Sequence, residues 1–416
     1  MPDLPLEDIR ILDLSQVYAG PLASRVLADM GAEIIRIESA IRSTRGGASA
    51  QPGAVYPDGD PGERPYNRSA YYNELHRNKL AISLDLSREQ GKEVFKQLVH
   101  ISDIVLENFT PRVMVNFGLD YESLREANPS IIMVSISAYG QTGPYRNYIS
   151  FGRGIEAMAG LSHITGYPDG PPLGPGTAYA DATGGLHAAF AALMALRHRR
   201  QTGKGQHIDL SLRESLVALL GENIVGLSMN KRGPRAMGNQ DDSALFQGCY
   251  RCKGRDKWVA LAICSERELE RLLRFLEERD LADREESINM LNLNRNRGEL
   301  DRRIEKWTVT HEPGHAMRIL QEAGIRAGSV MDAGELCSDP HLISRGFFHP
   351  LTHPEAGTFN HPGLPWKSSR FEFKSRISAP CFAQHNSYVL SDLLGFSGEH
   401  IRELENNGII SSRPIR

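Results

Sequence analysis

One carboxylate lies where it could take part in covalent chemistry. The segment 174–186, GPGTAYADATGGL, leads into an alanine-rich stretch that predicts a helix over residues 181–200, so Asp181 falls at the helix start. Backbone N–H groups and the helix dipole at such a position keep a carboxylate ionised, and Gly184 and Gly185 remove side-chain bulk one turn later. The residues alone favour a simple N-cap aspartate, and a nucleophile is the alternative.

Two other clusters contain residue types that bind metals. The segment His311-Glu312-Pro313-Gly314-His315 has the letters of a zinc-binding H-E-x-x-H helix, but Pro313 would interrupt the helix that this site requires. Cys249 and Cys252 have the spacing of half a zinc site, and no second cysteine pair follows at finger spacing. We therefore expect no metal, and we expect two half-buried thiols at these positions.

Several common enzyme motifs are missing. The sequence has no G-x-x-x-x-G-K-[ST] phosphate loop, no G-x-G-x-x-G after its first predicted strand, and no G-x-S-x-G turn. These absences remove the main sequence arguments for a P-loop NTPase, a nicotinamide-dependent enzyme and an α/β-hydrolase.

Composition excludes further classes of protein. The 416 residues include 48 Lys and Arg against 51 Asp and Glu, a net charge of −3 that argues against nucleic-acid binding. The longest strongly apolar stretch, 188–196, is far shorter than the roughly 20 residues that cross a bilayer. The first residues do not resemble a secretion signal, and five scattered cysteines suit a reducing compartment. We expect a cytoplasmic protein without membrane contact.

Strands and helices alternate over the first 140 residues. Strands are predicted at 9–14, 33–37, 81–86, 103–106 and 131–136, with one helix after Gly20-Pro21 and another behind a capping box at 87–90. This alternation predicts an α/β fold with a parallel sheet covered by helices. Residues 206–212 alternate like a half-buried strand. The stretch 43–67 is expected to be a disordered surface loop, with a lid or linker as the alternative.

The composition of the sequence changes near residue 221, where a polar, glycine-containing region begins. We expect a large domain in residues 1–200, a linker in 201–224, a smaller α+β domain in 225–330, and an extended connector with a last helical segment in 331–416. The small domain is expected to contain two helices, at about 266–284 and 299–306.

A series of short motifs runs through nearly the whole chain. They are LEDIRILDL at 6–14, AGP at 19–21, GAEIIRIE at 31–38, NK at 78–79, LENF at 106–109, GQTGPY at 140–145, RQTGKGQ at 200–206, DP at 339–340 and RGFF at 345–348. Together and in this order, they resemble the class III coenzyme A transferases, the family of formyl-CoA and carnitine-CoA transferases. The resemblance implies a Rossmann-like large domain built from both chain ends and an interlocked, ring-like homodimer.

The resemblance also implies a reaction. The catalytic aspartate of the family matches Asp181, which reverses the preference for a simple cap. The implied enzyme moves CoA from an acyl-CoA to a small carboxylic acid through an aspartyl anhydride and an aspartyl-CoA thioester. The segment 166–172, GYPDGPP, resembles family members that use succinyl-CoA. CoA would be a substrate, and no cofactor or metal would be bound permanently.

Candidate substrate contacts follow from the same motifs and from their places near strand ends, where open α/β sheets bind ligands. The expected CoA-binding residues are Val17, Tyr18, Ala19, Arg36, Asn78, Lys79, Asn108, Phe109 and Arg112. Tyr139 and Gln141 are expected near the thioester.

Two departures from the family pattern bear on specificity. After Met237 the chain reads GNQDDSA and lacks the glycine-rich loop of formyl-CoA transferase, which disfavours formate and oxalate. Phe151 occupies the position of the histidine of the related racemases, which removes one acid/base partner. An acyl-CoA racemase or epimerase and a non-catalytic subunit of a heteromeric transferase are the alternatives.

Overall fold

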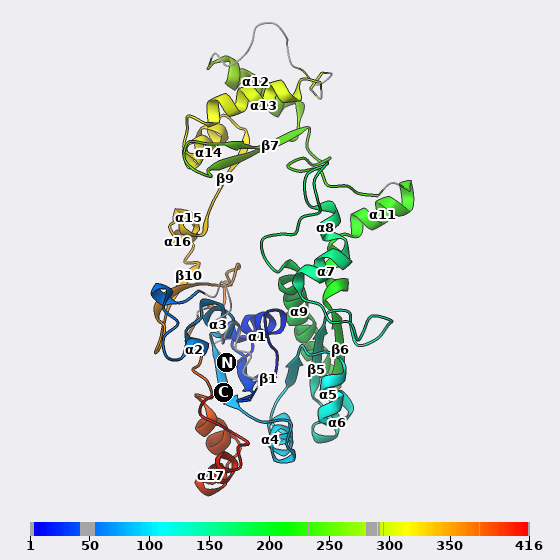
Figure 1. Ribbon diagram of the computed structural model, residues 1–416, viewed down its shortest axis with the longest axis vertical. Helices are drawn as coiled ribbons and strands as arrows, with labels where there is room; N and C mark the ends of the chain where they lie inside the picture. The colour runs from blue at the N-terminus through cyan, green and yellow to red at the C-terminus, as the bar shows by residue number, and fades with distance from the viewer. Residues whose placement is uncertain are drawn as a thin grey trace. The chain divides into compact units, whose positions relative to one another are not determined.

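The chain forms two compact units. The computed structural model describes residues 4–41, 55–231, 233–279, 289, 292–293, 295–373 and 375–414. The first unit comprises Met1–Ser162, Gly174–Gly233 and Ser344–Arg416, and the second comprises His163–Leu173 and Pro234–Ile343 (Figure 1). The first unit is therefore built from both ends of the chain.

A six-stranded parallel sheet forms the centre of the first unit. Its strands are β1 (Arg10–Asp13), β2 (Glu33–Glu38), β3 (Lys79–Ser83), β4 (Ile104–Glu107), β5 (Ile132–Ser137) and β6 (Gln206–Ser211). They lie in the order β3-β2-β1-β4-β5-β6, with Leu12 of β1 between Ile35 of β2 and Val105 of β4. This is the strand order of a Rossmann fold, and the predicted α/β class with a parallel sheet is confirmed.

Helices cover both faces of this sheet because its side chains point alternately to either side (Figure 1). Helices α1 (Ala19–Asp29), α9 (Tyr179–Thr202) and α10 (Leu212–Leu219) pack on one face. Helices α4 (Glu89–His100), α5 (Arg112–Phe117), α6 (Tyr121–Ala127) and α17 (Gly398–Asn406) pack on the other. The N-terminal strands and the C-terminal helix thus share one hydrophobic core.

The described residues also form several further helices, one hairpin and one π-helical turn. They are η1 (Pro57–Gly59), α2 (Pro65–Arg68), α3 (Ala70–His76), α7 (Gly152–Ala159), α8 (Leu161–Ile164), α11 (Gly221–Asn230), α15 (Ala333–Cys337), α16 (Pro340–Ser344), the hairpin β10 (Phe348–His353) and β11 (Gly357–Pro362), and the π-helical turn η2 (Tyr388–Leu393).

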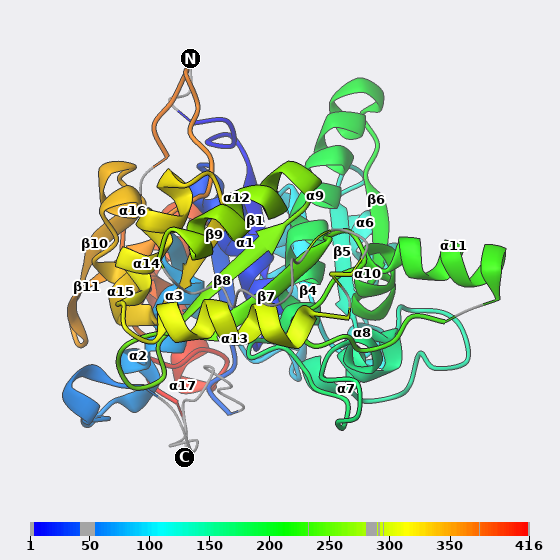
Figure 2. The same ribbon diagram turned by 90° about the horizontal axis from the view of Figure 1, so that it is seen from above.

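The second unit has its own antiparallel sheet. Strands β7 (Phe246–Arg251), β8 (Trp258–Ile263) and β9 (Arg326–Val330) pair in this order. Figure 2 shows helices α12 (Glu266–Glu277), α13 (Arg297–Thr308) and α14 (Pro313–Glu322) beside these strands, and their apolar side chains form a separate core.

The structure differs from the sequence-based expectations at four places. In the expected linker at 201–224, the strand predicted at 206–212 is present as β6, and the structure adds α10 and the start of α11 in the first unit. The expected connector in 331–416 contains the hairpin β10–β11. The capping box at 87–90 is wrong, because Ser87 donates to Asp85 and Arg88 precedes the helix without a side-chain cap. Of the expected loop at 43–67, residues 43–54 lie outside the described residues, and the rest is irregular except for η1 and the start of α2.

Candidate active site

Asp181 lies in the first turn of α9 but does not cap the helix. The N-cap residue is Ala178, which has no side chain to accept a hydrogen bond, and Asp181 is the third helical residue. The first helical N–H, that of Tyr179, donates to Oε1 of Glu156 on α7 and to the backbone oxygen of Thr177, each at 2.9 Å. The N-cap interpretation of Asp181 is therefore wrong, and its carboxylate is left available for another role.

The Asp181 carboxylate is half-buried and unusually basic. Burial raises its pKa to about 6, the negative charge of Glu156 adds to the rise, and its own backbone N–H opposes it. The helix start was expected to hold the pKa of this group low, but burial outweighs the helix. At neutral pH the group is still mostly ionised.

Glycine and tyrosine residues surround this carboxylate. A Cβ atom on Gly152, the first residue of α7, would lie 2.7 Å from Oδ2 of Asp181, so only glycine leaves that space. The rings of Tyr18 and Tyr71 lie 6.0 Å apart. Burial raises the pKa of both hydroxyls, and the Asp181 charge adds to the rise in each. Asp181, Gly152 and the two tyrosines thus form one local environment.

Gly184 and Gly185 serve helix packing rather than free space around Asp181. A Cβ on Gly184 would lie 2.1 Å from Leu212 of α10, and one on Gly185 would lie 2.5 Å from the backbone oxygen of Ala19 in α1. The two glycines therefore let α9 approach both helices closely. This contact brings the start of α1, and with it Tyr18, toward the Asp181 turn.

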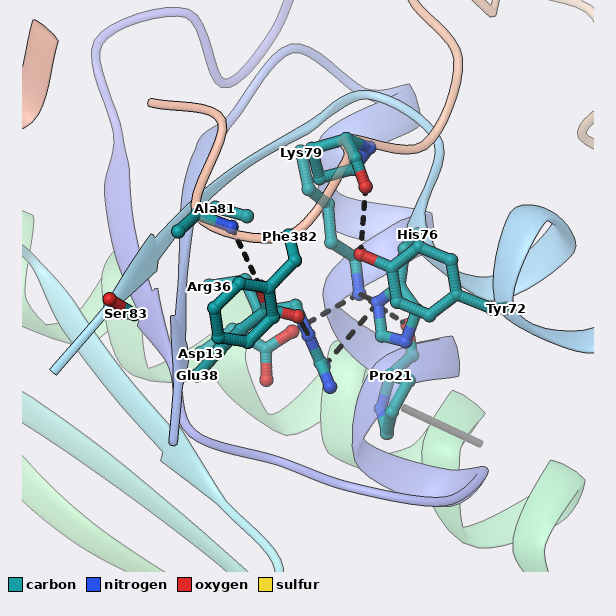
Figure 3. Close-up of polar contacts among 12 residues, drawn as sticks. Asp13, Pro21, Arg36, Glu38, Tyr72, His76, Lys79, Ala81, Ser83 and Phe382 are labelled. Atoms are coloured by element: carbon teal, nitrogen blue, oxygen red, sulfur yellow. Dashed lines mark hydrogen bonds and ion pairs between the residues drawn. The ribbon is translucent and has the colours of Figure 1, made fainter. Parts of the chain in front are cut away.

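A buried network of charged side chains contacts the loop that follows β1 (Figure 3). Lys79 is fully buried, and its Nζ lies 3.1 Å from Oδ2 of Asp13 and donates to the Pro21 oxygen at 3.0 Å. Arg36 is 4% exposed and donates from Nη1 to the oxygen of Ser15 at 3.0 Å. Burial lowers the pKa of Lys79 to about 8. Burial would raise the pKa of Asp13, but Lys79 and Arg36 lower it below its usual range.

Arg36, Lys79 and Asn78 therefore do not face solvent as the expected CoA contacts would. Lys79 and Arg36 use their charges inside the fold, on Asp13 and on the loop after β1. Asn78 is also buried, donates to Asp29, and accepts backbone N–H groups from residues 376 and 377. These three residues stabilise neighbouring backbone segments, among them the loop after β1.

Other predicted contacts lie on the loops at the carboxyl ends of β1 and β4. The Asn108 side chain accepts the N–H of Gln16 and donates to its oxygen, both at 2.7 Å, so the two loops are joined. Val17 has a positive φ of 64° and an exposed side chain, whereas Ala19 is buried in α1. This junction between β1 and β4 is the switch point of the sheet, where such folds bind ligands.

A cavity of about 570 Å³ opens at these strand ends. Residues from the ends of β1 to β4 line it, among them Gln16, Ser39, Asp85 and Phe109. Arg112 is exposed at the first residue of α5, directly after this edge.

Tyr139 and Gln141 follow β5. The Tyr139 ring packs against the rings of Tyr145 and Tyr148, with centroids 6.1 and 6.3 Å away. The Gln141 backbone N–H donates to Asp209 on β6 at 2.8 Å. No described contact joins either residue to Asp181, so their place near a thioester stays a prediction.

Comparison with known proteins identifies the family. The sequence profile of CoA-transferase family III matches residues 6–386. A succinyl-CoA–D-citramalate CoA-transferase from Chloroflexus aurantiacus is 31% identical over 98% of this chain and 99% of its own length. The alpha subunit of a succinyl-CoA–L-malate CoA-transferase from the same organism is 30% identical over 98% of this chain and 93% of its own. The chain belongs to CoA-transferase family III.

A solved structure agrees. A CAIB/BAIF family protein from Brucella suis superimposes with a TM-score of 0.83 at 28% identity, covering 94% of this chain and all of the other. The resemblance carried by the motifs is confirmed, and the protein is an enzyme that transfers CoA.

Sequence patterns did not reveal three residues around Asp181 in this family III enzyme. Gly152, Glu156 and Tyr71 lie 29, 25 and 110 positions before Asp181 (181 − 152, 181 − 156 and 181 − 71), and no spacing rule connects them to it. No helix was predicted over residues 152–159, so the sequence analysis gave no signal for the buried Glu156.

The structure also describes the two clusters with metal-ligand residue types. Pro313 is the first residue of α14, so the two histidines of 311–315 lie on either side of a helix start. Burial raises the pKa of Cys249, and that of Cys252 to about 11, which keeps both thiols protonated. Within the described ranges, no three His, Cys, Asp or Glu side chains gather as metal ligands. No helix there combines the length and apolar character needed to span a bilayer.

Proposed function

We propose that this enzyme transfers CoA from succinyl-CoA, or a similar acyl-CoA, to a small carboxylic acid with Asp181 as the covalent nucleophile. The observation that carries the proposal is the half-buried Asp181 carboxylate, free of a capping role and with a pKa raised to about 6. It combines ionisation at neutral pH with more basicity than an ordinary aspartate.

The proposed reaction has two halves. An Oδ atom of Asp181 attacks the thioester carbonyl. The C–S bond breaks, which releases CoA thiolate and forms an aspartyl-acyl anhydride. The thiolate then attacks the Asp181 carbonyl, releasing the donor acid and leaving an aspartyl-CoA thioester. The acceptor carboxylate repeats these steps in reverse, so that Asp181 is regenerated and no net proton is consumed.

The raised pKa matters energetically. An aspartate with an ordinary pKa of about 3.9 that expels a thiolate of pKa about 8.5 faces a gap of about 4.6 units, or roughly 6 kcal/mol. With Asp181 at about 6, the gap falls to about 2.5 units, or roughly 3 kcal/mol. A backbone N–H aimed at the tetrahedral oxyanion supplies about 3 to 4 kcal/mol.

We assign CoA to the switch-point edge of the sheet. The loop of residues 16–18 supports this assignment, because Gln16 lines the cavity while Tyr18 lies in the electrostatic environment of Asp181. We retain Val17, Tyr18, Asn108, Phe109 and exposed Arg112 as CoA contacts. Ala19, Arg36, Asn78 and Lys79 are buried and would support the loop rather than touch CoA.

We infer a homodimer and, because the relatives named above transfer CoA to D-citramalate and L-malate, a dicarboxylic acceptor. Leu186, Phe190 and Met194 lie one turn apart on α9 and are all at least half exposed, an apolar stripe that a second copy of the chain would cover. The interlocked arrangement, the succinyl donor and a cytoplasmic location are parts of this proposal. Because one relative carries the name of an alpha subunit, activity of the purified single chain is the test against a heteromeric enzyme.

The decisive test is chemical trapping. The enzyme is mixed with a panel of acyl-CoAs, hydroxylamine is added, and peptide mass spectrometry locates the hydroxamate. We expect the modification at Asp181, and none with Asp181→Ala. An active donor that never labels Asp181 would disprove the covalent mechanism, and loss of an α-deuterium from a 2-methylacyl-CoA would indicate a racemase instead.

A further inference from the structure

Glu156 makes an unusual contact at the start of α9. Its side chain is fully buried on α7, and its Oε1 accepts the N–H of Tyr179, the first residue of α9, at 2.9 Å. The same N–H also donates to the backbone oxygen of Thr177 at 2.9 Å, so Glu156 is the only one of its two acceptors that comes from another helix. The N-cap residue Ala178 offers no side-chain acceptor. An N-cap side chain accepts the N–H of the second or third helical residue, whereas Glu156 accepts the N–H of the first, so a residue on another helix holds the start of α9.

The second carboxylate oxygen of Glu156 is also informative. Oε2 is buried and has no hydrogen-bond partner among the described residues. A buried acidic oxygen without a partner costs folding free energy, so stability alone does not account for its presence. A Cβ atom on Gly174 would lie 3.4 Å from Oε2 and 2.5 Å from Nη1 of Arg153, so this oxygen and the Arg153 guanidinium flank the same point.

Helix α7 faces the Asp181 turn at two positions. Gly152 and Glu156 are four residues apart and so lie on the same side of the helix. Gly152 leaves room for Oδ2 of Asp181, and Glu156 holds the N–H two residues before Asp181. One face of α7 therefore fixes both the helix start and the space around the carboxylate.

We propose that Glu156 is a positioning residue for CoA transfer: by accepting the Tyr179 N–H, it fixes the first turn of α9 and aims the Asp181 carboxylate at the thioester. The proposal rests on the proposed role of Asp181. Glu156 does not touch the substrate, and it acts through the backbone of α9. A nucleophile displaced by about 1 Å can lose two orders of magnitude in rate, so a cap at this place has a direct kinetic effect.

The test compares substitutions that keep or remove the acceptor oxygen. Glu156→Gln keeps an oxygen for the Tyr179 N–H, whereas Glu156→Leu removes it at similar volume. The assay is exchange of CoA between succinyl-CoA and isotope-labelled succinate, which requires no knowledge of the natural acceptor. Glu126→Leu, which removes an exposed carboxylate on α6, is the matched control.

We expect Glu156→Leu to lower kcat at least about tenfold with the KM for succinyl-CoA within about threefold, and to slow formation of the trapped Asp181 adduct equally. Glu156→Gln should restore kcat to within about threefold of the parent. The proposal is overturned if Glu156→Leu retains kcat within threefold, or if Glu156→Gln is as impaired as Glu156→Leu.

A second pair of variants covers the case in which Glu156→Leu does not fold. Tyr179→Pro removes the N–H that donates to Glu156 and to the Thr177 oxygen, at the first helical position where proline is well tolerated, and Tyr179→Ala removes only the ring. We expect the proline variant to have at least about fivefold lower kcat than the alanine variant. Equal kcat values would contradict the proposal. Asp181→Ala in the same assay tests the nucleophile separately, since its activity would refute the proposed function whatever Glu156 does.

Discussion

Two aspartates of the first unit show opposite responses to burial. Asp13, at the end of β1, is completely buried, yet Lys79 and Arg36 hold the pKa of its carboxyl below the usual range. Asp181, at the start of α9, is only half-buried, yet its pKa rises to about 6. The difference lies in the neighbours, because Asp13 has two cations beside it whereas Asp181 has the negative Glu156. Placement of partners, rather than depth, decides which carboxylate supports the fold and which is suited to react.

The largest expected effect comes from removing the carboxylate that is proposed to react, that of Asp181. Asp181→Asn should reduce CoA transfer by at least about 10³-fold, because an amide cannot form the anhydride. The free energy of unfolding at pH 7 should not fall, and a rise of up to about 2 kcal/mol is expected, because a carboxyl with a raised pKa destabilises the fold once ionised. Urea unfolding and the exchange assay measure both. A variant that unfolds more easily would show that Asp181 has a structural role.

The next prediction concerns Asp13. Lys79→Met should lower the free energy of unfolding by about 3 to 5 kcal/mol, because it leaves a buried carboxylate without its ammonium partner. The double variant with Asp13→Asn should recover part of this loss. Lys96→Met is the control, since its pair with Glu93 is exposed and is worth less than about 1 kcal/mol. Equal losses from Lys79→Met and Lys96→Met would remove the basis of the comparison.

A third change acts on the space beside Asp181. Gly152→Ala should lower kcat by about 10- to 100-fold, because its Cβ would meet Oδ2 of Asp181 at 2.7 Å and displace the carboxylate. Stability should change by less than about 1 kcal/mol, since alanine is a good helix former. Gly298→Ala on α13, where nothing lies within 4 Å of the added carbon, is the control. Unchanged kcat in Gly152→Ala would mean that the carboxylate reacts from another position.

The smallest effect is a pH dependence. kcat/KM should fall about tenfold per unit as pH drops below about 6, because protonated Asp181 cannot attack. Asp13 has a lowered pKa, so its stabilising contribution is present above its unfolded pKa of about 3.9 and is lost only as pH falls through the lower folded value. The fold should therefore persist between pH 5 and 7 while activity falls, as parallel circular dichroism would report. A midpoint near pH 4 would contradict the raised pKa of Asp181.

Much of the large unit follows from local sequence patterns. Apolar strands such as 33–37 and 131–136, the proline in the first turn of α1 and Gly31 after it are short-range signals, and the structure confirms them. The capping box predicted at Ser87 was wrong because the N–H and the hydroxyl of Ser87 both donate to the Asp85 side chain, two residues earlier. The hairpin β10–β11 was missed because the pairs His349-Pro350, His353-Pro354 and His361-Pro362 suggest extended chain rather than paired strands.

The candidate site shows the same division between short-range signals and three-dimensional packing. Short-range patterns were enough to predict the family, the position of Asp181 at a helix start and the strand ends that meet at the switch point, because these depend on residues close together in the chain. The three-dimensional packing was needed to show that Arg36 and Lys79 are buried against Asp13, that Gly184 and Gly185 let α9 approach its neighbours, and that Glu156 accepts the first N–H of α9. Charge, burial and close packing depend on partners tens of residues away, and they set the basicity and the orientation of the one carboxylate proposed to react.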